Sequence, residues 1–286
     1  RPTLAACDVR TGSTAPYVAV CARPAPEGTW LRLQSCGEES AARGSAVVTA
    51  RMGIAGPAEA FERLREQGVD GAIVVNEASA LLRGVALPDE LRLVVVDSPP
   101  DPRYAGIETA HAAGSAAATT HLLELGHRRI AHIAGPASSY AAAERERGWR
   151  ETLAAAGLEP GPLLRGEWTS ESGFVAGGSL LDAEATAVVV ANDQMALGVL
   201  RAATERGIRV PEQLSVVGFD DVDDAQNYSP ALTTVRQPFD ELGRRAVGAV
   251  LDDAEAGSRE VVPAPLIVRA STASATAPVT EPVAGH

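Results

Sequence analysis

Basic residues are scarce in this 286-residue chain, and so are cysteines and long apolar runs. Its 25 Lys and Arg stand against 37 Asp and Glu, so the formal net charge is −12. Because phosphate contact needs a basic face, the chain as given is not expected to bind nucleic acid by itself. Its three widely spaced cysteines form no metal motif, and their odd number indicates free thiols in a reducing compartment. No apolar run approaches the ~20 residues that cross a bilayer, so we predict a cytoplasmic protein without membrane contact.

The motifs of common catalytic and metal sites are also missing. There is no G-x-S-x-G elbow, no phosphate loop and no G-x-G-x-x-G after a predicted strand. His127 and His132 are separated by a turn and part of a strand, which is poor spacing for shared metal ligation, so each is expected to be a core or surface histidine. The acidic run at 220–224 lacks the glycine that a calcium loop needs at its sixth position. We therefore predict no catalytic residue, no metal and no cofactor.

Length and composition fit a globular protein with two lobes. The chain is too long for one small core, and it is 45% hydrophobic and 22% charged. Short apolar runs alternate with helix-length segments, and the pattern starts again near residue 110, which predicts two α/β lobes with a cleft between them. Strands are predicted at 17–21, 46–49, 72–75, 93–96, 129–134, 163–167, 188–190, 216–219, 233–237 and 266–269. Helices are predicted at 29–43, 58–67, 110–125, 141–156, 172–181 and 240–253.

One complete strand–helix–strand unit, at 186–221, is the clearest element. The β-branched run at 188–190 is typical of a strand buried on both faces. Asn192 and Asp193 end this strand, and either can cap the helix that follows. The second strand ends at Asp220. A parallel pair joined by a helix must be a crossover unit.

The polar residues at the ends of these strands allow two interpretations. Asn192 and Asp220 would lie at the carboxyl edge of a parallel sheet, where ligands bind in open α/β folds. Their planar hydrogen-bonding groups suit ligand hydroxyls. The alternative is structural: Asn192 and Asp193 only cap a helix, and Asp220 and Asp221 only begin an acidic loop. Taken alone, these residues leave the two interpretations about even.

Several long, ordered motifs are specific enough to indicate a family. They are GHRRIAHIAGP at 126–136, R-x-R-G-W at 145–149, ANDQMALGVL at 191–200, SVVGFDD at 215–221 and LTTVRQP at 232–238. Together they resemble the LacI/GalR family of transcription regulators, from Arg1 to about Ala270. The resemblance implies an α/β fold with two Rossmann-like doubly wound lobes joined by three crossings. This is the type I periplasmic-binding-protein-like arrangement.

The resemblance also implies how the chain is divided. Residues 1–14 resemble the family's hinge, which enters the DNA minor groove with an apolar wedge, and Val9 occupies the wedge position. A helix-turn-helix headpiece is expected to precede Arg1 in the full protein. The implied lobes are an N-terminal one at 15–109 plus 239–266 and a C-terminal one at 110–238 plus 267–272, followed by a disordered tail at 273–286.

Ligand contacts can be carried over by position. The matching residues are Asn76, Asp97, Arg145, Trp168, Asn192, Asp220, Gln237 and Phe239. Asp97 resembles an acceptor for sugar hydroxyls, and the Arg145 fork resembles the arginine that holds them. Trp168 resembles an aromatic platform for the apolar C–H face of a sugar.

The remaining positions complete the implied pocket. Asn192 and Asp220 resemble paired polar residues from adjacent strands, while Gln237 and Phe239 resemble residues of the cleft floor. Asn76 is the weaker candidate, from the N-terminal lobe. His111 also matches the family, at a place assigned to contact between the lobes.

Each assignment has a structural alternative. Arg145 could pair with an adjacent glutamate, although neighbours on a helix do not face each other. Trp168 could belong to the core, and Asp97 could cap a loop. Asp97 and Asp220 could also serve as the paired carboxylates of a glycosidase. Nothing in the sequence indicates that one of them is protonated, so recognition of hydroxyls is the simpler account.

The predicted function is therefore that of a sugar-responsive transcription regulator, a repressor. A galactoside-like or other hexose effector would bind the core and alter operator binding by the headpiece. A homodimer is expected, through helices that start at Trp30 and Ala58, because the tail lacks the tetramer-forming leucine heptads of the family's namesake. The alternatives are an extracytoplasmic sugar-binding protein of a transporter and a sugar hydrolase. The hinge-like start and the free cysteines weigh against the transporter protein.

Overall fold

The computed structural model of the chain consists of two compact units. Unit 1 comprises residues 1–110, 138–141 and 238–263, and unit 2 comprises residues 111–137, 142–237 and 264–286. The structure describes residues 17–22, 36, 38–39, 41–43, 46–51, 61, 66, 68–75, 91–183 and 185–275. Apart from the short segment 138–141, the chain passes between the units after residues 110, 237 and 263, which are the three predicted crossings.

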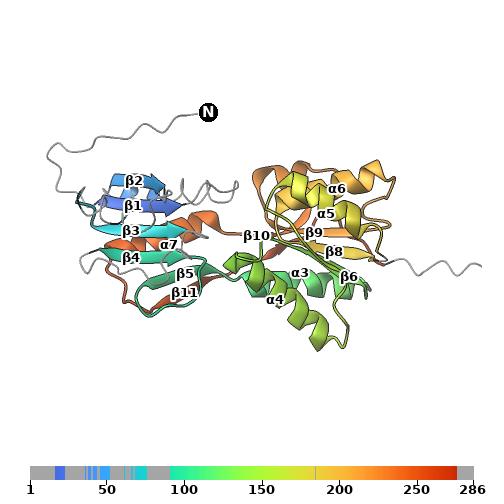
Figure 1. Ribbon diagram of the computed structural model, residues 1–286, viewed down its shortest axis with the longest axis horizontal. Coiled ribbons are helices and arrows are strands. Elements are labelled where there is room, and N and C mark those ends of the chain that lie inside the picture. The colour runs from blue at the N-terminus through green and yellow to red at the C-terminus, as the bar shows by residue number, and fades with distance from the viewer. Residues whose placement is uncertain are drawn as a thin grey trace, which may run out of the picture. The chain divides into compact units, whose positions relative to one another are not determined.

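Unit 1 contains a six-stranded sheet whose paired strands are all parallel (Figure 1). The strand order is β11-β5-β4-β3-β1-β2. The strands are β1 (Tyr17–Ala22), β2 (Ala46–Arg51), β3 (Gly71–Val75), β4 (Arg92–Val96), β5 (Ala105–Thr109) and β11 (Arg259–Val262). Helix α7 (Phe239–Leu251) packs on β3, β4 and β5. Its buried side, including Leu242 and Val247, forms one apolar cluster with Ile73, Val94 and Ile107.

Unit 2 contains the second six-stranded sheet, in the order β12-β10-β9-β8-β6-β7. Its neighbouring strands are parallel except for β12, which runs antiparallel to β10. The strands are β6 (Ile130–Ala134), β7 (Leu163–Arg165), β8 (Ala187–Val190), β9 (Ser215–Asp220), β10 (Thr233–Arg236) and β12 (Leu266–Ile267). The helices are α3 (His111–Glu124), α4 (Tyr140–Ala155), α5 (Ser170–Leu180), α6 (Asp193–Glu205) and the short 3₁₀ helix η2 (Asp223–Asn227).

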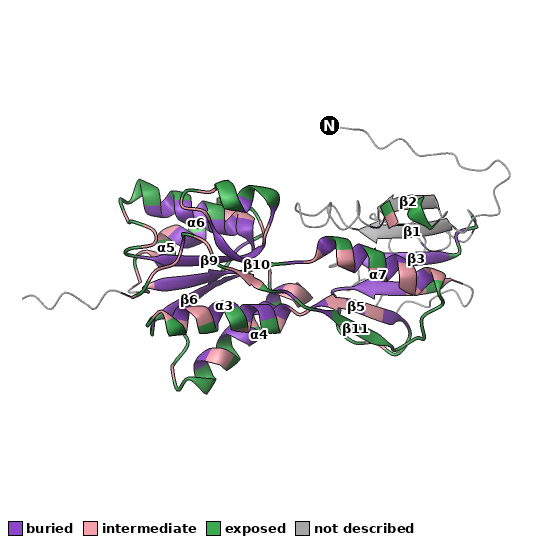
Figure 2. Cartoon of the chain, turned by 180° about the vertical axis from the view of Figure 1, so that it is seen from behind, coloured by how far each residue is buried: buried purple, intermediate pink, exposed green. Residues whose placement is uncertain are grey.

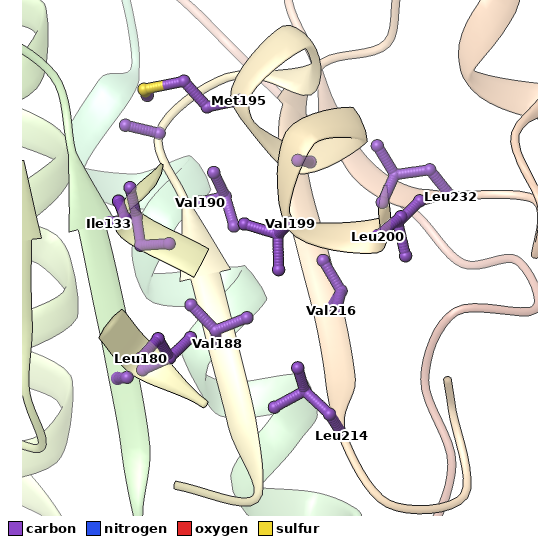
Figure 3. Packing of buried hydrophobic residues seen from close by; sticks show 14 of the residues in the cluster. Ile133, Leu180, Val188, Val190, Met195, Val199, Leu200, Leu214, Val216 and Leu232 are labelled. Atoms are coloured by element: carbon purple, nitrogen blue, oxygen red, sulfur yellow. The ribbon is translucent and has the colours of Figure 1, made fainter. Parts of the chain in front are cut away.

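Helices cover both faces of this sheet, because successive strand residues point to opposite sides. Ile133 and Val188 pack with α5 and α6 in one cluster, shown in Figure 3. Ile130 and Val189 pack on the other face, with apolar side chains of α3 and α4. Burial on both faces explains why these strands are short apolar runs without polar alternation, and Figure 2 shows them as buried throughout. The predicted doubly wound α/β class is confirmed.

Two strands of unit 1 were not predicted from the sequence. β5 is buried only at alternate positions, and β11 at the sheet edge carries three exposed residues in four. Neither strand has a continuous apolar run, which is the pattern used to find the others. The third chain crossing also differs from its predicted place, since β12 pairs with β10 and residue 266 therefore belongs to unit 2.

The first part of the predicted disordered tail is ordered. The Ala273 amide donates to the Ser215 hydroxyl at 3.1 Å. The Ala275 amide donates to the Leu125 carbonyl at 2.8 Å. The prediction of disorder is therefore wrong for residues 273–275, which are tied to unit 2 by backbone groups that the sequence pattern does not reveal. The rest of the tail lies outside the described residues.

Other predictions also fall outside the described residues. They concern the hinge at 1–14 with Val9, the dimer helices starting at Trp30 and Ala58, and the ligand contact Asn76. Within the described ranges, no helix has both the length and the apolarity to span a membrane. Nor do three or more metal-binding side chains gather anywhere in that part of the chain.

Candidate functional site

The carboxyl edge of the unit 2 sheet brings five predicted site residues into one cluster. Asn192 and Asp220 stand at the ends of β8 and β9, and Gln237 follows β10, whose Arg236 is in register with Asp220. Trp168 follows β7, and Arg145 reaches the same edge from α4. Strand ends in a parallel sheet meet at one edge, so residues far apart in the sequence become neighbours there.

Arg145 is the centre of the cluster. Its side chain is 4% exposed, and its Nη1 lies 3.6 Å from the Asp220 carboxylate and donates to the Ala191 carbonyl. Its guanidinium carbon stands 3.8 Å from the centroid of the Phe219 ring and 5.6 Å from that of Trp168. The alternative pairing with an adjacent glutamate is therefore wrong. Arg145 is thus a buried guanidinium held next to a carboxylate and two aromatic rings.

Asp220 is held by two neighbours and a strained backbone. Gln237 donates from its side-chain amide to the Asp220 carboxylate, and from its backbone amide to the Asp220 carbonyl at 3.0 Å. The φ angles of Asp220 and Asp221 are 124° and 55°. Positive φ costs a non-glycine residue about 1–3 kcal/mol and is tolerated where the surroundings impose it, often at functional sites.

Trp168 presents a half-buried ring next to Arg145. Its φ is 65°, again in the left-handed region. A Cβ at Gly135 would lie 2.3 Å from the edge of the indole, so only glycine lets the ring pack against the turn after β6. Trp168 also contacts the apolar cluster of α5 and α6. One side of the indole ring therefore packs against the core, as the structural alternative held, while part of the ring stays exposed.

Asn192 performs the structural role considered for it. Its side-chain oxygen accepts from the Met195 amide at 3.0 Å, so Asn192 is the N-cap of α6. Its side-chain nitrogen donates to the Trp168 carbonyl at 3.0 Å and to Gln194 at 3.1 Å. Asn192 thus fixes the Trp168 backbone, and contact with a ligand remains a prediction.

Asp193 was treated in the sequence only as the other possible cap. It is the wholly buried first residue of α6, and it accepts from the Thr234 hydroxyl at 2.6 Å and the Val222 amide at 3.0 Å. Burial raises the pKa of its carboxyl well above the usual range, and the charge of Asp220 raises this pKa further. A buried carboxyl with a raised pKa among strand ends indicates a functional site, independently of any sequence motif.

His111 begins α3 and is buried, and its Nδ1 lies 3.3 Å from Arg145 Nε, while its ring lies 5.9 Å from that of Phe219. Since Arg145 donates this hydrogen bond, His111 Nδ1 accepts it and carries no proton. His111 thus contacts Arg145 within unit 2, and the contact between lobes that the motif suggested stays a prediction.

Asp97 and Phe239 belong to unit 1. Asp97 ends β4 with a φ of 53°, and its carboxylate accepts from the Thr109 amide at 2.8 Å, which links the ends of β4 and β5. Phe239 begins α7 and is 8% exposed. Both therefore lie at the carboxyl edge of the unit 1 sheet or immediately after a crossing. Their roles toward a ligand stay predictions, as does that of Asn76.

The cluster offers three kinds of contact to a small molecule. The Asp220 carboxylate accepts hydrogen bonds, the Arg145 fork donates them, and the Trp168 ring provides an apolar face. This combination suits a ligand with hydroxyls on its rim and C–H groups on its faces. The carboxyl group of Asp193 is buried next to this cluster, and both of its oxygens accept hydrogen bonds, one from the Thr234 hydroxyl and one from the Val222 amide.

Comparison with known proteins supports the same class. A family model described as a periplasmic binding protein-like domain matches residues 119–272. The lactose operon repressor of Escherichia coli (strain K12) is 35% identical over 232 residues, which cover 78% of this chain and 64% of that protein. The HTH-type transcriptional regulator CelR of Thermobifida fusca is 40% identical over 157 residues, which cover 54% of this chain and 46% of CelR.

Solved structures agree over most of the chain. A lac repressor dimer bound to operator and the anti-inducer ONPF matches with a TM-score of 0.82 and 30% identity, covering 92% of this chain and 96% of that chain. A CelR–cellobiose complex matches with a TM-score of 0.77 and 31% identity, covering 89% and 84%. Fold and site together define a two-lobed, periplasmic-binding-protein-like protein. The chain belongs to the LacI family of transcription regulators, and it spans 64% of the length of the Escherichia coli relative.

Proposed function

We propose that this chain is the effector-binding core of a sugar-responsive transcriptional repressor. The effector is a small sugar, a galactoside or another hexose-based molecule, held at the carboxyl edge of the unit 2 sheet. The observation that carries the proposal is the cluster of Arg145, Asp220 and Gln237 beside the Trp168 ring. Two solved relatives support the ligand class, since one is bound to cellobiose and another to ONPF.

The test is a thermal-shift screen followed by calorimetric titration. A ligand that binds only the folded chain raises its melting temperature. Galactose, lactose, cellobiose and ONPG form the first panel, with adenine and guanine as purine controls. The proposal expects one or more sugars to stabilise the protein and the purines to have no effect. Stabilisation by a purine alone, or by none of the panel, would contradict the sugar class.

Asp220→Asn then locates the site. The amide keeps the size of the carboxylate and an acceptor for Gln237, while it removes the charge beside Arg145. Because a hydrogen bond to a charged group is worth roughly 1.5–3 kcal/mol, we expect about 10- to 100-fold weaker sugar binding. The exposed Asp182→Asn serves as the control, since Asp182 pairs with Arg206 on the surface of unit 2. Equal affinity of the two variants would remove Asp220 from the site.

DNA binding is proposed to reside in a headpiece joined to residues 1–14. Family membership supports this, and so does the hinge-like sequence with Val9 at the wedge position. The net charge of −12 disfavours contact of this chain with phosphates. The protein acts in the cytoplasm, where operator DNA is found, and turns over no substrate. A helix-turn-helix in the coding sequence upstream of Arg1 is the expected result, whereas a secretory leader there would favour the transporter protein.

A homodimer is the proposed assembly. The solved lac repressor relative is a dimer, and the adjacent helices α5 and α6 expose two large apolar side chains, Val175 at 62% and Leu197 at 41%. Sedimentation of Leu197→Asp should show more monomer than the wild type. Val268→Asp, at a valine that is 58% exposed and distant from α6 in the sequence, should remain dimeric. A dimer unaffected by Leu197→Asp would exclude the α6 face.

A further inference from the structure

We propose that Asp193 is a positioning residue of the candidate site, which holds Asp220 and Gln237 in place from behind without touching the ligand. The inference rests on the proposed function and extends it. Asp193 is wholly buried, and both of its carboxylate oxygens are used within unit 2. It is the first residue of α6, directly after the N-cap Asn192. One side chain therefore lies where three strand ends meet.

The first contact fixes the end of β9. One carboxylate oxygen of Asp193 accepts from the Val222 amide at 3.0 Å. Asp220 is the last residue of β9, Asp221 lies between it and Val222, and both have positive φ. A strained turn of this kind persists only where its ends are held by the surrounding structure. The bond to Val222 supplies such a constraint two residues beyond Asp220, whose direction toward Arg145 depends on this turn.

The second contact fixes β10. The other oxygen of Asp193 accepts from the Thr234 hydroxyl at 2.6 Å, and Thr234 is in register with Gly218 of β9. Three residues further along β10, Gln237 donates to the Asp220 carboxylate. Asp193 therefore links the two strands whose ends carry this hydrogen-bonded pair.

Gly218 shows that the space is reserved for the carboxyl group. A Cβ at Gly218 would lie 2.3 Å from Asp193 Oδ1, a distance that no side chain can adopt without displacing the carboxylate. The φ of Gly218 is not in the left-handed region, so close approach and not conformational freedom requires glycine here. The glycine at this position of β9 thus leaves space for the buried carboxyl group of Asp193 next to the candidate site.

The chain provides a matched control at the opposite edge of the same two strands. The wholly buried Ser271 accepts from the Thr233 amide and donates to the Val216 carbonyl, so it also links β10 to β9 through two hydrogen bonds. Ser271 is near the amino ends of these strands, away from Asp220 and Gln237. Removing either group costs two buried hydrogen bonds, roughly 1–3 kcal/mol for each group left unsatisfied. Only the loss of Asp193 should disturb the site.

The experiment compares Asp193→Ala, Asp193→Asn and Ser271→Ala in two measurements. The first is hydrogen exchange of the peptide covering residues 219–230, which contains the Val222 amide and leaves out the Thr233 amide that donates to Ser271. We expect faster exchange there in Asp193→Ala than in Ser271→Ala. The second is calorimetric titration with the panel sugar that stabilises the wild type most. We expect Asp193→Ala to bind it about tenfold more weakly and Ser271→Ala within about threefold of the wild type, where tenfold is 1.4 kcal/mol.

Asp193→Asn tests whether a side chain that can make both hydrogen bonds is sufficient to position Asp220 and Gln237. Its amide can accept from the Val222 amide and donate to the Thr234 hydroxyl, so affinity and exchange should return to within about threefold of the wild type. If Asp193→Ala fails to fold, Thr234→Val removes the β10 contact alone and should still weaken binding more than Ser271→Ala. Equal affinity and equal exchange of the site variants and Ser271→Ala would overturn the proposal. If no sugar binds the wild type, the proposed function fails, and the exchange result alone decides the role of Asp193.

Discussion

The two edges of the unit 2 sheet are built from different chemistry. At the amino edge, the His127 ring lies within hydrogen-bond distance of the Thr186 and Ser215 hydroxyls and the Ala273 carbonyl, at 2.9–3.0 Å. Burial lowers the pKa of His127, so neutral groups satisfy one another there. At the carboxyl edge, buried charges and positive-φ backbone are concentrated around Arg145 and Asp220.

The difference indicates which edge is under functional constraint. The amino edge ties down the C-terminal segment with hydrogen bonds that any stable fold could use. The carboxyl edge holds a buried ion pair and left-handed residues, both of which cost free energy and neither of which the sheet itself requires. Among the described residues of unit 2, the non-glycine residues with positive φ are Trp168, Asp220 and Asp221, and all three follow strand ends at this edge.

Arg145→Ala should produce the largest effect on this comparison. It leaves the Asp220 carboxylate buried without its cation, which should lower the free energy of unfolding by about 3–5 kcal/mol. It also removes the guanidinium donor, so sugar affinity should fall more than about 100-fold. Urea unfolding and calorimetry measure the two effects. Arg147→Ala, on the exposed side of the same helix, should cost less than about 1 kcal/mol and leave affinity unchanged. Similar costs for both variants would mean that the carboxyl edge is no more constrained than the surface.

His132 tests the sheet between the two edges. It lies in β6, stacks on Trp149 and is wholly buried, and burial lowers its pKa from 6.5 to about 4. Its neutral form is favoured in the fold, so its contribution is complete above pH 6.5. Below that pH the unfolded chain takes up a proton first, and about 3 kcal/mol is lost by pH 4. Urea unfolding from pH 7 to 4 should show a shallower decline in His132→Phe. An unchanged slope would exclude His132 as the source.

The two edges should also titrate in opposite directions. The pKa of Asp193 is raised by burial and by Asp220, so its stabilising contribution is complete below the unfolded pKa and is lost as pH rises through the folded pKa. The pKa of His127 is lowered by burial, so its contribution is complete above the unfolded pKa and is lost as pH falls. Unfolding free energies of Asp193→Asn and His127→Gln, measured across pH, should differ from the wild type with opposite slopes. Slopes of the same sign would contradict this account of the edges.

Trp168→Leu should give the smallest effect. It removes an aromatic face from the carboxyl edge while keeping an apolar side chain over Gly135. Aromatic contacts are worth about 0.5–1.5 kcal/mol beyond their buried area, so sugar affinity should fall about three- to tenfold. Phe174→Leu is the matched control, because Phe174 also lies under a guanidinium, that of Arg201 at 4.4 Å, but outside the cluster. Equal binding by the two variants would remove the indole from the site.

The sequence allowed the central fold to be predicted because burial leaves a strong pattern. β8, α6 and β9 follow from a β-branched run, a polar cap and a glycine stop, and the structure has them within a residue or two of the predicted bounds. β11 was missed because an edge strand with exposed charges has no apolar pattern. The ordered segment after β12 was missed because it is held by backbone hydrogen bonds, to which Ala and Ser contribute no pattern.

The candidate site was predictable only in part, for a similar reason. Motif positions identified Arg145, Trp168, Asn192, Asp220 and Gln237, and the structure brings them together. The role of Asp193 was missed because it depends on β10 and the end of β9, which are distant in sequence. The contact of His111 with Arg145 of α4 was not predicted for the same reason. Acidic residues are common in the first turn of a helix, so the sequence indicates no further role for Asp193.

A crystal structure of the chain with the most stabilising sugar of the panel tests the central claim most directly. The account predicts density for the sugar at the carboxyl edge of the unit 2 sheet, with a C–H face on the Trp168 ring and hydroxyls within hydrogen-bond distance of Arg145 and Asp220. Sugar density elsewhere, with these side chains still closed on one another, would contradict it.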